Sequence, residues 1–156
     1  MLEAKYFISN TEEYAKRLEQ VDKLGKEKRH APIFNMEMKT ILQGMNVGLW
    51  IVRLDTNSGE GELYTDETMR KLLGIDDSVT PKECFKHWQE NIHKKYYSDV
   101  DKLVDDMANS KNVTQAEYLW HHPQKGILNV RCSGRCVEKS NRIMVFEGFH
   151  RIIDNI

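Results

Sequence analysis

The stretch "EYLWHHPQKGILNVRCSGRC", residues 117–136, holds two histidines and two cysteines on either side of a Pro-Gln-Lys-Gly linker. It permits two interpretations: a metal site, or a β-hairpin whose strands carry ligand-type side chains by coincidence. If residues 123–126 form the turn, His122 faces Ile127 across the hairpin. The predicted cross-strand partners are then residue 121 with 128, 119 with 130 and 117 with 132.

Distances along a strand decide between the two interpretations. A strand advances about 3.3 Å per residue, which places Cys132 and Cys136 about 13 Å apart on one face. Zinc holds each of its sulfur ligands at about 2.3 Å, so these two cysteines cannot share a tetrahedral site. His121 and His122 point to opposite faces, and His121 lies about 13 Å from Cys132 even if the two share a face. We therefore predict a hairpin and no metal site.

The segments around this hairpin predict an α+β domain. Upstream, "VGLWIVRLD" and "ELYT" are predicted short strands that flank the turn "NSGEG". The helical patterns "DETMRKLLGI", "TPKECFKHWQENIH" and "YYSDVDKLVDDMANS" follow. The last strands are expected at about residues 113–122, 126–138 and 142–153. This order predicts a five-stranded antiparallel sheet with short helices on one face.

Two amphipathic helices are predicted before the sheet, mostly within residues 1–42, and the folded domain is assigned to residues 43–156. Their apolar side chains recur at spacings of three and four residues. Such stripes either pack against the following domain or pair with a second copy in a homodimer, and the sequence leaves both open. The stripe residues are Tyr14, Leu18, Val21, Phe34, Met38, Ile41 and Met45.

Composition narrows the class of protein. A length of 156 residues suits one domain, and a net charge of -1 gives no electrostatic reason to expect a nucleic-acid partner. No apolar run approaches the roughly 20 residues of a membrane span, and the start "MLEAKYFISN" lacks the features of a secretory signal. Three cysteines form no disulfide framework, so we expect a reduced, cytoplasmic setting.

One pair of residues suggests catalysis. Cys84 and His87 are three residues apart on a predicted helix and can touch. A thiolate–imidazole pair is a nucleophile signature, although no acidic or amide group that would orient the imidazole is identifiable. A small α+β thiol enzyme is therefore an alternative function. It requires a Cys84 thiol that reacts fast with alkylating agents.

From about Gln43 to Asp154 the chain resembles a PAS domain of bacterial signalling proteins. The matching pieces are "GLWIVRLD", "ELYTDETMRKLLGI", "TPKECFKHWQENIHKKYYSDVDKLVDDM", "AEYLWHHPQKGILNVRCSGR" and "MVFEGFHRII". Their order and spacing are similar to sensory PAS domains that precede diguanylate cyclase (GGDEF) or histidine kinase modules. The resemblance implies a non-catalytic sensory or dimerisation module with a C-terminal effector. Because the chain stops just past the last strand, we expect an excised piece or a truncated product.

The resemblance also bears on cofactors. The light-sensing flavin subtype places a reactive cysteine in an Asn-Cys-Arg-Phe-Leu-Gln setting, and "KECFKH" around Cys84 does not match it. Haem-binding relatives use a histidine of the long helix, and residues 96–109 contain none. Neither flavin nor haem is expected. The family's terminal Asp-Ile-Thr has no clear counterpart, because Asp154 falls two positions late.

A small-molecule pocket is expected where the sheet curls over the helices. Its candidate lining comes from aromatic and apolar side chains of separate elements, with two polar anchors. These residues are Trp50, Tyr64, Met69, Leu73, Phe85, Trp88, Tyr118, Trp120 and Val130, with Arg131 and His150 as the anchors. The other interpretation is a core that these side chains fill, which would make the domain a structural spacer without a ligand.

Overall fold

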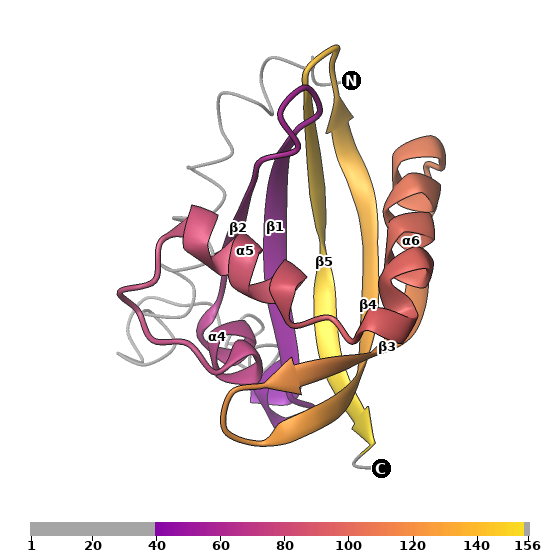
Figure 1. Cartoon of the computed structure of the whole chain (residues 1–156). Helices are drawn as coiled ribbons and strands as arrows, with labels where there is room; N and C mark the ends of the chain where they lie inside the picture. Colours follow the sequence, from indigo (N-terminus) through magenta and orange to yellow (C-terminus); the bar gives the residue numbers. More distant parts are fainter. Residues whose placement is uncertain (1–39, 155–156) are drawn as a thin grey trace.

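A computed structural model describes residues 40–154 of the chain. Five antiparallel strands form one sheet in the order β2-β1-β5-β4-β3, and three α-helices lie against one of its faces (Figure 1). The strands are β1 (Val47–Asp55), β2 (Gly61–Thr65), β3 (Thr114–His122), β4 (Gly126–Lys139) and β5 (Ile143–Asp154). The helices are α4 (Glu67–Leu73), α5 (Pro81–Glu90) and α6 (Tyr97–Asn109), with a 3-10 turn η1 (Lys94–Tyr96) before α6. The predicted fold class is confirmed.

Most residues of the predicted N-terminal stripes lie outside the described part of the chain: Tyr14, Leu18, Val21, Phe34 and Met38. Residues 40–44 are helical, as predicted for the end of the second helix. Within the described part of the chain, no helix has the length and apolar character needed to cross a membrane.

Local capping positions the helices against the sheet. The Asp66 side chain accepts a hydrogen bond from Met69 N at 2.8 Å, which starts α4, and another from Leu49 N at 3.1 Å, which ties that start to β1. Thr80 and Glu83 form a capping box at the start of α5. Helices α4 and α5 therefore begin within the predicted helical patterns, and the start of α4 is also tied to β1.

The hairpin of β3 and β4 is confirmed, but its predicted register is wrong by one residue. His122 pairs with Gly126, and Ile127 pairs with His121. Gly126 has a positive φ of 78°, which lets the chain enter β4 directly after a three-residue turn. The Nδ1 atom of His122 accepts the backbone N–H groups of residues 124 and 125, both at 3.0 Å, and so closes that turn.

The sheet separates two apolar clusters. On its helix-covered face, side chains of all five strands and three helices form the main core. On the other face lies a smaller cluster of Ile51, Ile143 and Val145, against which Tyr64 packs. The strict alternation of strand side chains between faces therefore decides which residues can reach the helices.

Candidate functional site

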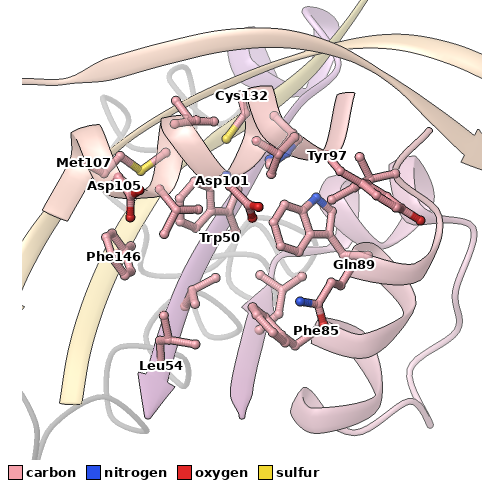
Figure 2. Close-up of a pocket in the computed structure, with 18 of the residues that line it drawn as sticks. Trp50, Leu54, Phe85, Gln89, Tyr97, Asp101, Asp105, Met107, Cys132 and Phe146 are labelled. Carbon is pink, nitrogen blue, oxygen red and sulfur yellow. The ribbon is translucent and has the colours of Figure 1, made fainter. Parts of the chain in front are cut away.

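A cavity of about 770 Å³ lies between the inner face of the sheet and helices α5 and α6 (Figure 2). Trp50 and Leu54 of β1 and Phe146 of β5 contribute from the sheet, and Phe85 and Met107 contribute from the helices. The volume falls within the range of small-molecule sites, and the lining is mostly apolar and aromatic, as such sites require. These features favour a small-molecule site over a domain whose aromatic side chains only fill a core.

Two glycines create space for the indole of Trp50. Trp50 lies opposite Gly148 on β5, and Gly148 lies opposite Gly134 on β4. A Cβ atom at Gly148 would lie 2.6 Å from Trp50 Cζ2, and one at Gly134 would lie 2.8 Å from Trp50 Cη2. The indole therefore covers bare backbone on the inner face of the sheet, and larger residues at either position would displace it.

A chain of hydrogen bonds fixes the imidazole of His150. Trp88 Nε1 donates to Tyr118 Oη at 2.8 Å, and Tyr118 Oη lies within hydrogen-bond distance of His150 Nε2. Because an indole N–H can only donate, His150 Nε2 is the one acceptor among the hydrogen-bond partners of Tyr118 that can take its hydroxyl proton. A neutral imidazole that accepts at Nε2 carries its proton at Nδ1. The network therefore assigns His150 the Nδ1–H tautomer.

Burial keeps this network neutral. Desolvation lowers the pKa of His150 to about 3, because the buried imidazolium would lose its hydration. Desolvation also raises the pKa of Tyr118 well above its ordinary value. At physiological pH the cavity wall therefore presents an uncharged imidazole and an uncharged phenol.

Two donors in this wall have no partner. Among the described residues, Trp50 Nε1, His150 Nδ1 and Arg70 Nε are the buried side-chain polar atoms without a hydrogen bond. Arg70 Nε lies 2.9 Å from Asp77 Oδ1 in an ion pair, which leaves the indole and the imidazole. Each buried donor without an acceptor costs about 1–3 kcal/mol. Both side chains line the cavity, and their ring centroids are 5.8 Å apart.

The charged side chains of the cavity lining are all acidic. Glu90, Asp101 and Asp105 are exposed, and no lysine or arginine is found among the described residues that line the cavity. Figure 2 shows Asp101 and Asp105 projecting from α6 beside the apolar lining. The acidic run of α6 is a solvated helix surface, as its sequence indicates, and two of its residues also contribute to the lining.

The predicted pocket residues separate into three groups. Trp50, Phe85, Trp88 and His150 line the cavity, and Tyr118 contacts two of them through hydrogen bonds. A second group is buried in the surrounding core and does not line the cavity: Met69, Leu73, Trp120 and Val130. That any of these residues binds a ligand stays a prediction.

Two predicted pocket residues lie on the wrong side of the sheet. Tyr64 packs on the outer cluster, and its hydroxyl donates to Glu62 Oε2 at 3.1 Å. Arg131 forms an ion pair with Glu117 at 2.7 Å in which both side chains remain largely accessible to solvent. Each of the two residues is next in sequence to a residue whose side chain points to the inner face. Because successive side chains of a strand point to opposite faces, both point away from the cavity.

The sequence reasoning missed Gly134, Gly148, Cys132 and Phe146. A glycine inside a strand often marks the close approach of another group, so Gly148 in "FEGFH" carried a usable signal. No sequence pattern identified Cys132 and Phe146 as lining residues, because this depends on which side chains of β4 and β5 point to the inner face.

The geometry gives the thiol-enzyme alternative no support. His87 Nε2 lies 2.8 Å from Leu73 O and its Nδ1 lies 3.4 Å from Asn91 Nδ2, so the ring links α5 to α4. Burial raises the pKa of Cys84 to about 12, which keeps the sulfur protonated and unreactive. Among the described residues, no group of three or more His, Cys, Asp or Glu side chains is placed to hold a metal.

No family model and no curated protein matches the sequence. Solved structures do match. A sensory box histidine kinase/response regulator from Burkholderia thailandensis is 16% identical with a TM-score of 0.54, covering 75% of this chain and 84% of that one. The N-terminal domain of a diguanylate cyclase with PAS/PAC sensor from Marinobacter aquaeolei is 16% identical with a TM-score of 0.50, covering 68% and 94%. A PAS domain from Colwellia psychrerythraea is 10% identical with a TM-score of 0.53, covering 75% and 97%.

These likenesses show that the described residues have the PAS fold, as the sequence resemblance predicts. At such low identity they establish the fold alone, and the function has to be argued from the cavity and its side chains.

Proposed function

We propose that this domain is a sensory module of a bacterial signal-transduction protein, located in the cytoplasm. It binds a small ligand in the cavity or mediates homodimerisation, and it passes the signal to a C-terminal effector. The observation that supports this proposal best is the cavity of about 770 Å³, which is lined mostly by apolar groups. Solved PAS domains from a histidine kinase and from a diguanylate cyclase share the fold.

Signal transfer follows from which elements surround the cavity. Helices α5 and α6 form one side of it, and Phe146 and His150 of β5 form part of the other. A ligand that contacts both sides favours the arrangement of helices and sheet in which both sets of contacts form. Because β5 is the last strand, a change in its position or twist is transmitted directly to whatever follows it.

Dimerisation would use the N-terminal stripe. Within the described residues, that stripe retains Ile41 and Met45, which are 55% and 49% exposed. Large apolar side chains with this exposure are available to a partner helix.

The module is proposed to be non-catalytic. Its cysteine–histidine pair lacks an activated sulfur, because burial holds the Cys84 thiol in its protonated form. We expect alkylation of Cys84 in the folded protein to be slow, near the rate at which the domain opens. Alkylation at the rate of a free thiolate would revive the enzyme alternative.

Native mass spectrometry, compared with the mass of the denatured chain, tests the proposal. We expect a dimer that retains extra mass. The variant Val104→Phe should lose the extra mass, because Val104 lines the cavity and the added ring occupies it. The matched control Val113→Phe, at a position that is 64% exposed, should retain it. A bare monomer would contradict the proposal. A dimer without added mass would support homodimerisation alone and favour a structural spacer, or a sensor that loses its ligand on purification.

A further inference from the structure

The lining of the cavity changes in character from its buried part to its solvent-exposed part. The buried lining is apolar and includes Trp50, Leu63 and Phe146, which are at most 5% exposed. We call the exposed side chains of the lining the opening. They are Gln89, Glu90, Tyr97, Asp101 and Asp105. A ligand that matches this order has an apolar body inside the cavity and a polar group at the opening.

One stripe of helix α6 contributes three residues to the opening. Tyr97, Asp101 and Asp105 follow each other at a spacing of four residues, and all three line the cavity. Residues with this spacing lie one above the other on a helix, so a phenol ring and two carboxylates form a row beside the apolar lining (Figure 2). Aromatic faces and carboxylates both attract organic cations.

The two carboxylates of this stripe are not neutralised by neighbouring side chains. Within the described part of the chain, no ion pair includes Asp101 or Asp105. Asp106, which does not line the cavity, is paired with Lys102 at 3.5 Å. Like charges four residues apart on a helix repel each other, so a cation bound beside Asp101 and Asp105 relieves a repulsion that the free protein contains.

Helix α5 adds negative potential at the same opening. Glu90 is its last residue, so the negative end of the helix dipole lies beside the cavity. The pair of Glu90 with Lys86 at 3.8 Å neutralises this charge only weakly, because both side chains are more than half exposed. No described lining residue is a lysine or an arginine. An anionic group at the opening would therefore be repelled by both helices, whereas a cationic group is attracted.

We propose that the cavity binds an amphiphilic organic cation, whose apolar body enters the cavity and whose protonated amine stays at the opening beside Asp101 and Asp105. This inference rests on the proposed function and specifies the charge class of the ligand. Because both carboxylates are exposed, the ammonium group keeps much of its hydration, and binding does not require a buried ion. The apolar body supplies affinity, and the opening selects the charge.

Three probes that share one body and differ in the end group test the inference. They are phenylbutylammonium, phenylbutanol and phenylbutanoate, each with the ring and the end group at opposite ends of the chain. Calorimetric titration measures their affinities for the full chain. At low ionic strength we expect the amine to bind about tenfold more tightly than the alcohol, and the carboxylate more weakly than the alcohol. At about 1 M salt, where the Debye length is about 3 Å, the advantage of the amine should shrink to about twofold.

Matched variants of α6 locate the cation. Asp101→Asn and Asp105→Asn should each weaken the amine about threefold and leave the affinity of the alcohol unchanged, which also shows that the cavity is intact. The control Asp106→Asn removes the same charge from a position outside the lining and should leave both affinities nearly unchanged. Equal weakening of the amine by Asp101→Asn and Asp106→Asn would overturn the placement of the cation at the opening.

The remaining outcomes separate this inference from the proposed function. Equal affinity of amine and alcohol at low ionic strength overturns the inference and leaves the cavity as a binding site, as does tightest binding of the carboxylate. Undiminished amine binding by Val104→Phe, whose added ring occupies the cavity, also overturns it, because the amine would then bind to the acidic surface alone. Absence of binding by all three probes up to about 10 mM overturns the inference and the ligand-binding function together.

Discussion

Two tryptophan–histidine pairs lie on the inner face of the same sheet and differ in one respect. Trp120 and His122, at the hairpin end, have ring centroids 6.2 Å apart, and Trp50 and His150, at the cavity, have centroids 5.8 Å apart. All four side chains are buried. In the first pair every ring nitrogen has a hydrogen-bond partner. In the second pair, Trp50 Nε1 and His150 Nδ1 have none.

The same two residue types are therefore fully hydrogen-bonded at the hairpin and incompletely hydrogen-bonded at the cavity. The hairpin pair supports the fold, since His122 closes the turn and its Nε2 lies 3.3 Å from Lys71 O at the end of α4. Buried polar atoms without partners are rare, and where they occur they need a reason. At the second pair, the unpartnered Trp50 Nε1 and His150 Nδ1 each cost the folded protein about 1–3 kcal/mol.

The largest expected effect concerns pH. The folded pKa of His150 is about 3, against about 6.5 in an unfolded chain, so between these values the unfolded state binds more protons. Stability is highest above pH 6.5 and falls as the pH drops toward 3. The loss from this one group reaches about 1.4 kcal/mol per pH unit, or about 4 kcal/mol from pH 6.5 to 3.5.

Urea titrations at a series of pH values measure this loss. The matched variant His150→Gln keeps an acceptor for Tyr118 and cannot titrate, so the difference between the two curves isolates His150. Parallel curves for the two proteins would show that His150 binds a proton as readily in the fold as in the unfolded chain, and the lowered pKa of the buried imidazole would be wrong.

A second prediction concerns the close approach of Trp50 to the sheet. In Gly148→Ala the added Cβ would clash first with the backbone oxygen of Ser133, and it would lie 2.6 Å from Trp50 Cζ2 and 2.7 Å from Gly134 Cα. The two backbone contacts cannot relax by side-chain rotation. We expect a loss of about 3 kcal/mol in the free energy of unfolding. The control Gly44→Ala, which meets nothing within 4 Å, should show no such loss. Equal stability of the two variants would mean that neither the β4 backbone nor Trp50 lies this close to Gly148.

A third prediction contrasts the two histidines that are adjacent in the sequence. His122→Ala removes the acceptor of two turn N–H groups and the contact with Lys71 O, and we expect a loss of about 2 kcal/mol. His121→Ala removes an exposed ring stacked on His93 at 5.4 Å, and its effect should stay within about 0.5 kcal/mol. Thermal unfolding of both variants measures the difference, and similar losses would contradict the assigned facing.

Much of the fold could be predicted from the sequence because its signals are local. Apolar periodicity located α6, the helical pattern "TPKECFKHWQENIH" located α5, and short β-rich runs located the strands. The hairpin register was not predictable in the same way. It depends on the positive φ of Gly126 and on hydrogen bonds to His122, which shorten the turn by one residue.

The candidate site was only partly predictable because its defining contacts span long distances in sequence. Trp50, Phe85, Trp88 and His150 were identified as pocket residues from their types. The inward or outward facing of Tyr64 and Arg131 was not predicted correctly. The network that leaves His150 Nδ1 without a partner joins residues 30 and 32 positions apart, from α5, β3 and β5. No local pattern reports which polar atoms such a network leaves unsatisfied.

The smallest expected effect is the most direct test of the comparison between the two pairs. Trp120→Phe and Trp50→Phe delete the same atoms from two buried positions. The first also leaves Trp88 O, in the last turn of α5, without its donor, whereas the second removes a donor that had no acceptor. We therefore expect Trp120→Phe to lose about 1 kcal/mol more than Trp50→Phe in urea titrations of the ligand-free protein. If Trp50→Phe proves the costlier change, the indole N–H of Trp50 has a hydrogen-bond partner in the free protein, and the contrast between the two pairs is wrong.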